Sequence, residues 1–422
     1  MSLRVRLAPS PTGFLHIGTL GMAIVNRMIA NTNKGVFYLR IEDTDQKREI
    51  EGATEQLIND LALFGIKFDE GPYVQSQRKE IYQKYVQELI EKNLAYKDFN
   101  EDRTYCVRLR ATSKFDVTWK DLVKGDMKLP SLERDPVILK SNGIPPYNLA
   151  HVVDDHLMKT TIITRGEEWL PSTAEHIQLA SAVWGEGKAP WKYAHMPVIC
   201  IVDNGNKRKL SKRKDASALA SHYLSNGYPT EAVIEYLLTI YNSKFEPWRR
   251  ENPGKAYTEF KFSMEDIGSN NPLFDIAKLN HISKEIISKK TCAQINKEID
   301  KYFKTYSPET SKEVIAKIKQ ILKIDRETEK PRKDIACYAD IKTEYDFLFA
   351  RPNVEKSDLA KAFTKTFNNS DTKEVWLEKI KSLNDKSAMK EIRKTLTGKD
   401  TGPDLYQIMQ ILGAEEVMAR LL

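Results

Sequence analysis

The chain contains 422 residues, enough for two or three hydrophobic cores at roughly 150 residues per domain, which excludes a peptide hormone or a single small module. Its 66 Lys and Arg residues exceed its 59 Asp and Glu residues, and the net charge of +7 is spread over both halves of the chain. This mild excess suits a polyanionic partner but does not identify one.

Four cysteines, at positions 106, 200, 292 and 337, lie far apart in the sequence. They form no C-x-x-C pair of the kind that binds zinc and no dense disulfide framework. The N-terminus lacks the apolar region of a signal peptide, and no window approaches the roughly 18 continuous apolar residues of a membrane span. We therefore expect a soluble, cytoplasmic protein.

The N-terminal sequence predicts a β-α-β-α unit. Apolar residues alternate over 3–7, a loop follows at 9–13, and Ile17, Leu20, Ile24 and Met28 then recur at helical spacing. The apolar run 36–39 is typical of a strand buried on both faces, and a helical stripe begins at Ala53. A strongly amphipathic helix is expected over 81–93.

The middle of the chain combines an insertion with a return to periodic elements. Residues from about 97 to 140 are expected to be irregular. The elements expected after them are a helix over 149–157, a strand over 161–163, a helix from Ser172 with a capping box to Glu175, a strand over 195–202 and a linker over 248–254.

Beyond this linker, Gly and Pro become rarer and the apolar pattern is helical. Leu405, Ile408, Met409 and Leu412 recur at i, i+3, i+4 and i+7. The sequence thus predicts an α/β domain with an insertion, followed by an all-helical region.

The first βα loop is a candidate nucleotide site, because ligands collect at the carboxyl ends of parallel strands. It contains Ser10, Thr12, Gly13, His16 and Gly18. A histidine at a helix N-terminus can donate hydrogen bonds to a phosphate that gains charge in a transition state. Taken alone the signal is weak, and a histidine that merely begins a helix is the simpler interpretation.

A cationic run at 207–214 holds six cations in eight positions. A bare charge run is usually a solvated loop. Here, however, Lys209 and Lys212 lie three residues apart after a strand and a turn, with Ser211 between them, so both lysines could engage one polyphosphate. Neither G-x-x-x-x-G-K-[ST] nor G-x-G-x-x-G occurs, which excludes phosphate binding by those loops.

Five sequence blocks stand out when they are read together. They are R-L-A-P-S-P-T-G-F-L-H-I-G-T at 6–19, R-I-E-D-T-D at 40–45, Y-N-L-A-H-V-V-D-D-H at 147–156, R-G-E-E-W at 165–169 and K-L-S-K-R at 209–213. In this order they resemble the glutamyl-tRNA synthetases, a class I family. The resemblance covers residues 1 to about 245, and L-T-G-K-D-T-G-P-D-L at 396–405 resembles the end of an anticodon-binding region.

The resemblance implies a Rossmann-type class I catalytic domain with an inserted acceptor-binding subdomain and an all-α C-terminal region. The implied parts are the first half of the catalytic domain at 1–96, a shortened connective insertion on the acceptor-stem side at 97–146, the second half with a KMSKS-type loop at 147–250, and a helical anticodon-binding region at 251–422.

The same resemblance implies site residues by position. The implied catalytic residues are His16, Gly18, Lys209 and Lys212. Contacts to ATP are implied for Ala8, Ser10, His16, Gly18, Glu168, Lys209, Leu210, Ser211 and Lys212. Glutamate is implied to lie against Arg6, Ser10, Glu42, Tyr147, His151 and Arg165, with Arg6 and Arg165 facing its side-chain carboxylate and Glu42 its ammonium group.

Departures from the family pattern concern the glutamate pocket and the insertion. His151 stands where bacterial relatives commonly carry asparagine, and Gly21 where they often place Arg or Tyr. The insertion lacks the cysteines that hold zinc in some relatives, so we expect ATP with Mg²⁺ as substrate complex and no zinc. His151 and His156 would diverge by about 140° on a helix, which argues against a metal site there.

The expected function is ligation of L-glutamate to tRNA(Glu) through glutamyl-adenylate, by a cytoplasmic monomer. A glutaminyl enzyme would carry Pro-Glu-Pro where this chain has Ala8-Pro9-Ser10-Pro11, and a tRNA-modifying relative would lack the helical half. An inactive tRNA-binding protein is disfavoured by the intact catalytic motifs. Whether glutamine tRNA is also charged stays open.

The residues that could read the anticodon are aromatic rings beside cations. Tyr345 with Arg351 and Phe363 with Lys365 are possible readers, and the alternative is that both rings belong to the hydrophobic core.

Overall fold

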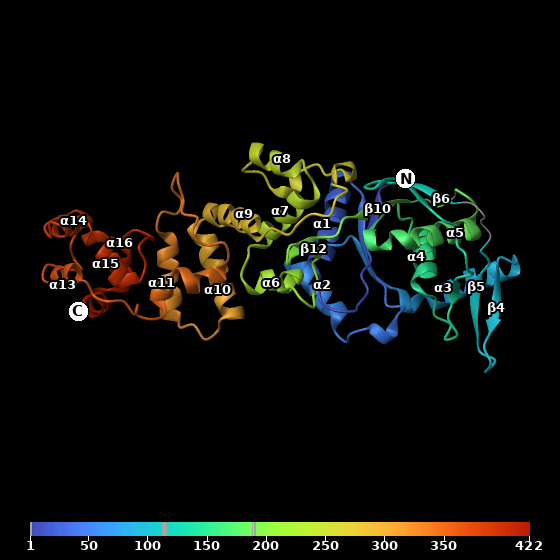
Figure 1. Ribbon diagram of the computed structural model, residues 1–422, viewed down its shortest axis with the longest axis horizontal. Coiled ribbons are helices and arrows are strands. Elements are labelled where there is room, and N and C mark those ends of the chain that lie inside the picture. Colours follow the sequence, from blue (N-terminus) through green and yellow to red (C-terminus); the bar gives the residue numbers. More distant parts are fainter. Residues whose placement is uncertain (1, 112–115, 188, 190) are drawn as a thin grey trace. The chain divides into compact units, whose positions relative to one another are not determined.

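The computed structural model describes residues 2–111, 116–187, 189 and 191–422 (Figure 1). The chain forms two compact units. The first comprises Met1–His222 and Ile234–Asp275, and the second comprises Tyr223–Val233 and Ile276–Leu422. Residues 112–115 of the expected insertion lie outside the described residues.

A parallel sheet of five strands organises the first unit. In spatial order its strands are β10 (Lys192–Met196), β9 (Ile162–Gly166), β1 (Arg4–Leu7), β2 (Val36–Ile41) and β3 (Glu70–Val74). The chain adds β2 and β3 on one side of β1 and later adds β9 and β10 on the other, and every pairing is parallel. The order therefore reverses beside β1, where open α/β sheets bind their ligands.

Helices connect the strands as the periodicity predicts. They are α1 (Ile17–Thr32), α2 (Ala53–Leu63), α3 (Lys79–Glu91), α4 (Tyr147–Leu157) and α5 (Thr173–Trp184). Leu20, Ile24 and Met28 of α1 are buried, as expected. Strand β3 was not expected. The capping box at Ser172 does not form, because the 3₁₀ helix Glu167–Ser172 runs directly into α5 and leaves Ser172 in a helical conformation.

The insertion is ordered β-structure, so the expectation of an irregular segment was wrong. Strands β4 (Ala95–Phe99), β5 (Tyr105–Leu109) and β8 (Val137–Leu139) form an antiparallel sheet, and β6 (Val117–Asp121) pairs with β7 (Gly125–Leu129) as a hairpin. Each strand has only three to five residues, and only β8 consists of apolar residues alone, so no long apolar or alternating run marks the segment in the sequence.

The strand expected over 195–202 is two strands. β10 ends at Met196, Pro197 follows, and β11 (Cys200–Asp203) then pairs with β12 (Asn206–Lys209) in an antiparallel hairpin that leads into the cationic run. Proline cannot donate a ladder hydrogen bond, which accounts for the break.

The first unit extends further than the expected boundary after Arg250. Helices α6 (Ala220–Ser225), α7 (Thr230–Tyr241) and α8 (Phe245–Glu251) follow the cationic run. Helix α8 occupies most of the linker expected over 248–254. Phe260 packs against Phe245 at 5.2 Å between ring centroids, and the Phe262 amide donates to Thr32 Oγ1 at 3.0 Å. This ring contact and this hydrogen bond attach residues 251–275 to the α/β body.

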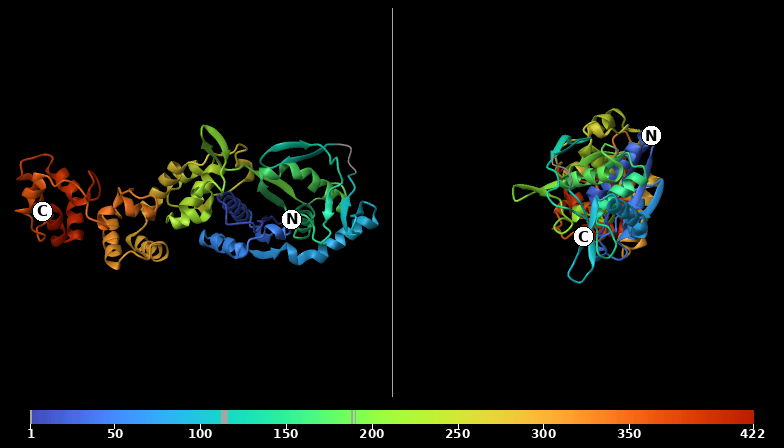
Figure 2. Two further views of the ribbon diagram at one scale, coloured as in Figure 1. Left: turned by 60° about the horizontal axis from the view of Figure 1, so that its bottom comes forward. Right: turned by 90° about the vertical axis from the view of Figure 1, so that its right-hand side faces the viewer.

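Residues 276–422 contain helices and no strand (Figures 1 and 2), which confirms the predicted helical region. The helices are α9 (Ile276–Lys289), α10 (Cys292–Tyr306), α11 (Lys312–Lys323), α12 (Ile341–Glu344), α13 (Asp358–Thr364), α14 (Lys373–Lys381), α15 (Ala388–Thr397), α16 (Leu405–Leu412) and α17 (Ala414–Leu421). The four apolar residues predicted for α16 are all buried. Within the described part of the chain, no helix is long and apolar enough to cross a membrane.

The aromatic rings considered as anticodon readers belong to the core of the second unit. Phe363 is fully buried and Tyr345 is 2% exposed. Arg351 pairs with Glu416 at 2.8 Å. The alternative interpretation as core aromatics therefore holds for both rings.

Phe262→Ala should lower the free energy of unfolding of the first unit by about 3–5 kcal/mol, because it removes a buried ring from a segment with linker-like sequence. Denaturant unfolding measures this effect. The exposed neighbour substitution Lys261→Ala is the control. Equal stability of the two variants would show that residues 251–275 do not stabilise the α/β body.

Candidate active site

The residues singled out in the sequence come from separate elements of the first unit. Arg6 lies in β1, His16 begins α1, Glu42 follows β2, Arg165 lies in β9 and Lys209 ends β12. Their strands are neighbours in the sheet or lead into loops beyond its carboxyl edge. Two groups of contacts result, one around His16 and the lysines and one around Arg165.

His16 links the start of α1 to the cationic run at 207–214, called the lysine loop below. Its Nδ1 accepts a hydrogen bond from the Gly18 amide at 2.9 Å, so Nε2 carries the proton and donates to the Leu210 carbonyl at 3.2 Å. Burial lowers the pKa of His16, and the cationic charges of Lys212 and Lys209 lower it further. The imidazole is therefore a neutral hydrogen-bond donor at neutral pH.

Asp215 fixes the shape of the lysine loop. Its carboxylate accepts two hydrogen bonds from Arg208, at 2.7 and 2.8 Å, and one from the Ser211 amide at 2.9 Å. The hydrogen bond from Arg208 is the largest cause that lowers the pKa of Asp215 to about 2. Sequence reasoning missed both residues, although an acidic residue directly after a cationic run was a visible signal.

The two lysines of the loop are directed to different partners. Lys209 Nζ forms an ion pair with Glu168 Oε1 at 2.7 Å, and Lys212 Nζ donates to the Phe14 carbonyl. Burial lowers the pKa of Lys212. The Lys212 ammonium group thus lies beside the loop after β1, and the Lys209 ammonium group lies beside the turn after β9.

A cavity of about 230 Å³ lies between these elements. Among the residues expected to contact ATP, it is lined by His16, Gly18, Glu168 and Lys209. The other expected residues, Ala8, Ser10, Leu210, Ser211 and Lys212, do not line it. Thr19, Met22, Gly166, Met196, Pro197, Val198, Ile199 and Tyr241 complete the wall, and sequence reasoning had assigned none of these.

Gly21 is explained by Tyr241. A Cβ atom at position 21 would lie 2.5 Å from Tyr241 Cε2, closer than any real contact allows. The ring is 3% exposed and also lines the cavity beside His16. Gly21 therefore makes room for a wall residue of this cavity.

Arg165 is a buried cation held by neutral partners. Its Nε donates to His195 Nε2 at 2.9 Å, Nη1 to His176 Nδ1 at 2.8 Å and Nη2 to Thr173 Oγ1 at 2.7 Å. Its guanidinium also lies 4.8 Å from the centre of the Tyr193 ring. Among the described residues no carboxylate lies within 4.0 Å of it, although it is only 4% exposed.

Arg6 is neutralised within the chain. Its Nε donates to Asp155 Oδ1 at 3.0 Å and its Nη1 to the Thr164 carbonyl at 2.8 Å. Arg40 donates to the same carboxylate at 3.1 Å and to Glu42 at 2.9 Å. The alternative interpretation of Glu42, a salt bridge to Arg40 within the same block, therefore holds, whereas no role beside Arg6 had been expected for Asp155.

Tyr147 is coupled to the charges of this group. Burial raises its pKa, the charge of Glu42 raises it further, and the charges of Arg165 and Arg6 lower it. Its ring stacks on His151, with centroids 5.3 Å apart. The structure thus brings together five of the six residues expected at glutamate, whereas Ser10 is exposed in the loop after β1.

His151 is neutral and incompletely bonded. Burial is the main cause that lowers its pKa to about 3. Nδ1 lies 2.8 Å from Asp155 Oδ2 without hydrogen-bond geometry, and Nε2 has no hydrogen-bond partner among the described residues. His156 instead stacks on Trp184 at 3.8 Å, and Asp154 accepts from Arg78 and Tyr82. The histidines and aspartates of α4 therefore have separate roles.

The family comparisons match both halves of the chain. Residues 2–104 and 99–247 match the model of the class I tRNA synthetase (E and Q) catalytic domain, and residues 381–422 match the anticodon binding domain. Glutamate–tRNA ligase from Clostridium beijerinckii is 36% identical over 98% of this chain and 92% of its own length. The enzyme of that name from Acetivibrio thermocellus is 34% identical over 99% and 92%.

The chain belongs to the glutamate–tRNA ligase family. A crystal structure of a glutamate tRNA ligase from Elizabethkingia meningosepticum in complex with its amino acid has the same fold, with a TM-score of 0.82, 24% identity and coverage of 100% of this chain and 98% of that one. The resemblance found in the sequence blocks is thereby confirmed, as is the fold class of a class I catalytic domain followed by a helical region that contains an anticodon binding domain.

Gly21→Ala should destabilise the first unit by about 1–3 kcal/mol, because the added methyl group overlaps the buried Tyr241 ring. Denaturant unfolding measures the loss, and the KM for ATP should rise with it. In the double variant Gly21→Ala/Tyr241→Leu the clashing ring atoms are gone, so most of the lost stability should return. A Gly21→Ala protein as stable as the parent would contradict this packing.

Proposed function

We propose that this chain carries out the reaction of its family, the ATP-dependent ligation of L-glutamate to tRNA(Glu), with glutamate bound at Arg165 and ATP bound between His16 and the lysine loop. The observation that carries the assignment of glutamate is the buried Arg165 guanidinium, which has no carboxylate partner among the described residues. Uncompensated charge at such depth is costly, and a substrate carboxylate would remove that cost.

The pairing of charges supports this position for glutamate. The buried group contains three guanidinium ions, from Arg6, Arg40 and Arg165, and two carboxylates, from Asp155 and Glu42. Asp155 and Glu42 pair with Arg6 and Arg40, and the ionised Asp121 reaches Arg165 only through the His195 ring, so Arg165 is the one of these three guanidinium ions without a direct carboxylate contact among the described residues. The side-chain carboxylate of glutamate would supply that contact. Arg165 would receive a carboxylate, and Glu42 is the acidic group suited to the ammonium.

The His16 and lysine contacts suit a nucleotide that gains charge as it reacts. His16 Nε2–H and Lys212 Nζ now donate to backbone carbonyls of the chain itself, so an incoming phosphate needs only to replace one neutral acceptor for each. A charged acceptor makes the stronger hydrogen bond. We expect Mg²⁺ to enter with ATP as part of the substrate complex and expect no zinc.

The reaction then needs few groups from the protein. A glutamate carboxylate oxygen attacks the α-phosphorus of ATP, and pyrophosphate leaves with the bonding electron pair. A ribose hydroxyl of the terminal adenosine of the tRNA next attacks the activated carbonyl, and AMP leaves. The chain aligns the reactants and stabilises the developing phosphate charge. We expect it to act as a monomer in the cytoplasm, where protein synthesis consumes the product.

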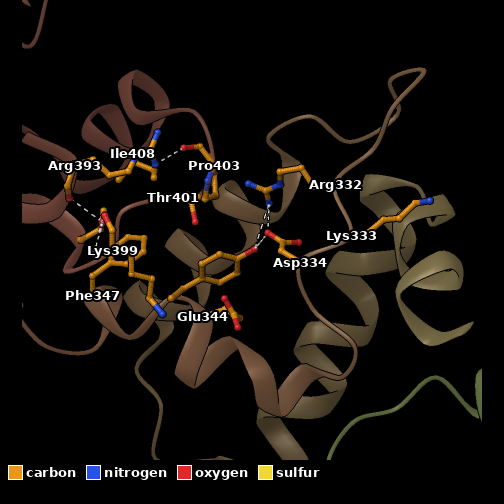
Figure 3. A pocket seen from close by; sticks show the side chains of 13 residues that line it. Arg332, Lys333, Asp334, Glu344, Phe347, Arg393, Lys399, Thr401, Pro403 and Ile408 are labelled. Carbon is orange, nitrogen blue, oxygen red and sulfur yellow. Dashed lines mark hydrogen bonds and ion pairs between the residues drawn. The ribbon is translucent and has the colours of Figure 1, made fainter. Parts of the chain in front are cut away.

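For the tRNA anticodon we propose a pocket of about 390 Å³ in the second unit (Figure 3). Arg332, Arg393 and Lys399 line it together with Phe347. The Nε and Nη1 atoms of Arg332 are buried and have no hydrogen-bond partner among the described residues, while Nη2 donates to the Ile321 carbonyl at 3.0 Å. Buried hydrogen-bond donors without acceptors are rare. The carbonyl groups of a splayed RNA base would supply acceptors for the two Arg332 nitrogens.

Lys212→Ala should slow the formation of glutamyl-adenylate by about 10²-fold or more, because it removes a donor to phosphate charge that develops in the transition state. Single-turnover adenylate formation measures the rate, and tRNA binding should be nearly unchanged. Lys214→Ala, which removes an exposed lysine of the same loop, is the matched control. An unchanged rate in the Lys212 variant would remove it from this role.

Arg165→Gln should raise the KM for glutamate far more than the KM for ATP, by roughly a hundredfold, because the charged fork that faces a carboxylate is lost. Aminoacylation kinetics with each substrate varied in turn provide the measurement. The glutamate assignment would be refuted by an unchanged KM for glutamate.

Arg332→Gln should weaken aminoacylation of tRNA(Glu) by about tenfold in kcat/KM, through the loss of hydrogen bonds to one base. Transcripts with single anticodon substitutions and with the glutamine anticodon identify the base concerned, since the penalty should vanish for one of them. Lys330→Gln is the control for charge alone, because Lys330 is exposed and does not line the pocket. An equal loss with every transcript would indicate phosphate contact without base reading.

A further inference from the structure

A buried carboxylate of the insertion lies behind the proposed glutamate site. Asp121, at the end of β6, is 1% exposed. Its Oδ1 accepts hydrogen bonds from the amides of Val123 and Lys124 at 3.0 Å and of His195 at 3.1 Å. Its Oδ2 lies 2.5 Å from His195 Nδ1. The hairpin of the insertion is thereby attached to the carboxyl end of β10.

This contact determines which nitrogen of His195 carries the proton. Burial alone would raise the pKa of Asp121, but the hydrogen bonds from His195 and the two hairpin amides lower it, so Asp121 is an ionised acceptor. Burial lowers the pKa of His195, which keeps the ring neutral with its proton on Nδ1. Nε2 then has a lone pair that accepts from Arg165 Nε at 2.9 Å, and the Thr173 hydroxyl lies 3.2 Å from the same nitrogen.

Arg165 depends on such acceptors, because no carboxylate holds it among the described residues. His176 is oriented in the same way, since its Nε2–H donates to Asn148 Oδ1 at 2.9 Å and its Nδ1 accepts from Arg165. Each histidine can accept only while a second group holds its proton on the far nitrogen.

We propose that Asp121 is a positioning residue for glutamate recognition: it holds His195 in the Nδ1–H tautomer, and His195 thereby fixes the orientation of the Arg165 guanidinium. The proposal rests on the proposed function, in which Arg165 binds a glutamate carboxylate. It gives the insertion a role inside the amino acid site. Asp121 itself touches no substrate in this role.

The substitution Asp121→Asn tests the tautomer directly. The amide oxygen can still accept from the three backbone amides, and the amide nitrogen then replaces Oδ2 and donates to His195 Nδ1. The proton of His195 must move to Nε2, where it faces the Arg165 Nε–H. Two buried donors then oppose each other, and the KM for glutamate should rise roughly tenfold to a hundredfold. The KM for ATP should stay within about twofold.

Two further variants separate positioning from folding. Asp126→Asn removes an exposed carboxylate from the same hairpin and should leave both KM values unchanged. His195→Gln supplies an amide oxygen, which has no tautomers, as acceptor for Arg165. Asp121→Asn should therefore add little to the KM for glutamate in the His195→Gln background.

The outcomes distinguish this proposal from the proposed function. If Arg165→Gln raises the KM for glutamate but Asp121→Asn does not, the positioning role of Asp121 is refuted and the glutamate site stands. If Arg165→Gln has no effect on this KM, the glutamate assignment itself fails. Equal increases in both KM values with Asp121→Asn, or a full additional effect in the His195→Gln background, would show that Asp121 acts only in folding.

Discussion

The carboxylate of Asp155 is the contact on which the amino acid site depends. It comes from α4 and accepts hydrogen bonds from Arg6 of β1, Arg40 of β2 and, at 2.6 Å, Thr160. Burial would raise the pKa of Asp155, but Arg40 and Arg6 hold it well below its usual range. Removing one member of such a buried group leaves an uncompensated charge, typically at a cost of about 3–5 kcal/mol. Two strands and a helix are thereby fixed together.

This arrangement gives Arg6 and Arg165 different roles. Arg6 and Arg165 are equivalent candidates in the sequence, since both are guanidinium groups at the ends of parallel strands. In the structure Asp155 already neutralises Arg6, whereas Arg165 is surrounded by neutral acceptors. Arg6 therefore contributes mainly by fixing Asp155, and through it His151, while Arg165 retains the charge that a substrate can neutralise.

Much of the fold could be predicted because its signals are local. The break at Pro9–Gly13, the helical spacing after His16 and the cationic run are each contained in a few consecutive residues. The strands of the insertion could not be predicted in this way, since each is short and becomes regular only when its partner supplies the hydrogen bonds. The same holds for residues 251–275, where the Phe262 amide finds its acceptor in Thr32, 230 positions away.

The candidate site residues follow the same distinction. His16, Lys209 and Arg165 could be singled out as candidates because they stand in recognisable blocks. Asp121 and His195 were missed because neither has a signature in sequence: they lie 74 positions apart and gain meaning only through their mutual hydrogen bond. Gly21 illustrates the converse, since it departs from the family pattern and only the position of Tyr241 explains it.

The missing direct carboxylate contact of Arg165 among the described residues also bears on the choice between glutamate and glutamine at the proposed amino acid site. Glutamine has the same shape but a neutral side chain, so it would leave the Arg165 guanidinium without a carboxylate contact. A glutamine amide would also turn an N–H group toward a guanidinium that can only donate, unless its oxygen faced Arg165. Both effects favour glutamate, and both depend on Arg165 having no carboxylate partner in the chain. An acidic residue placed beside it would remove the basis of this discrimination without changing the shape of the pocket.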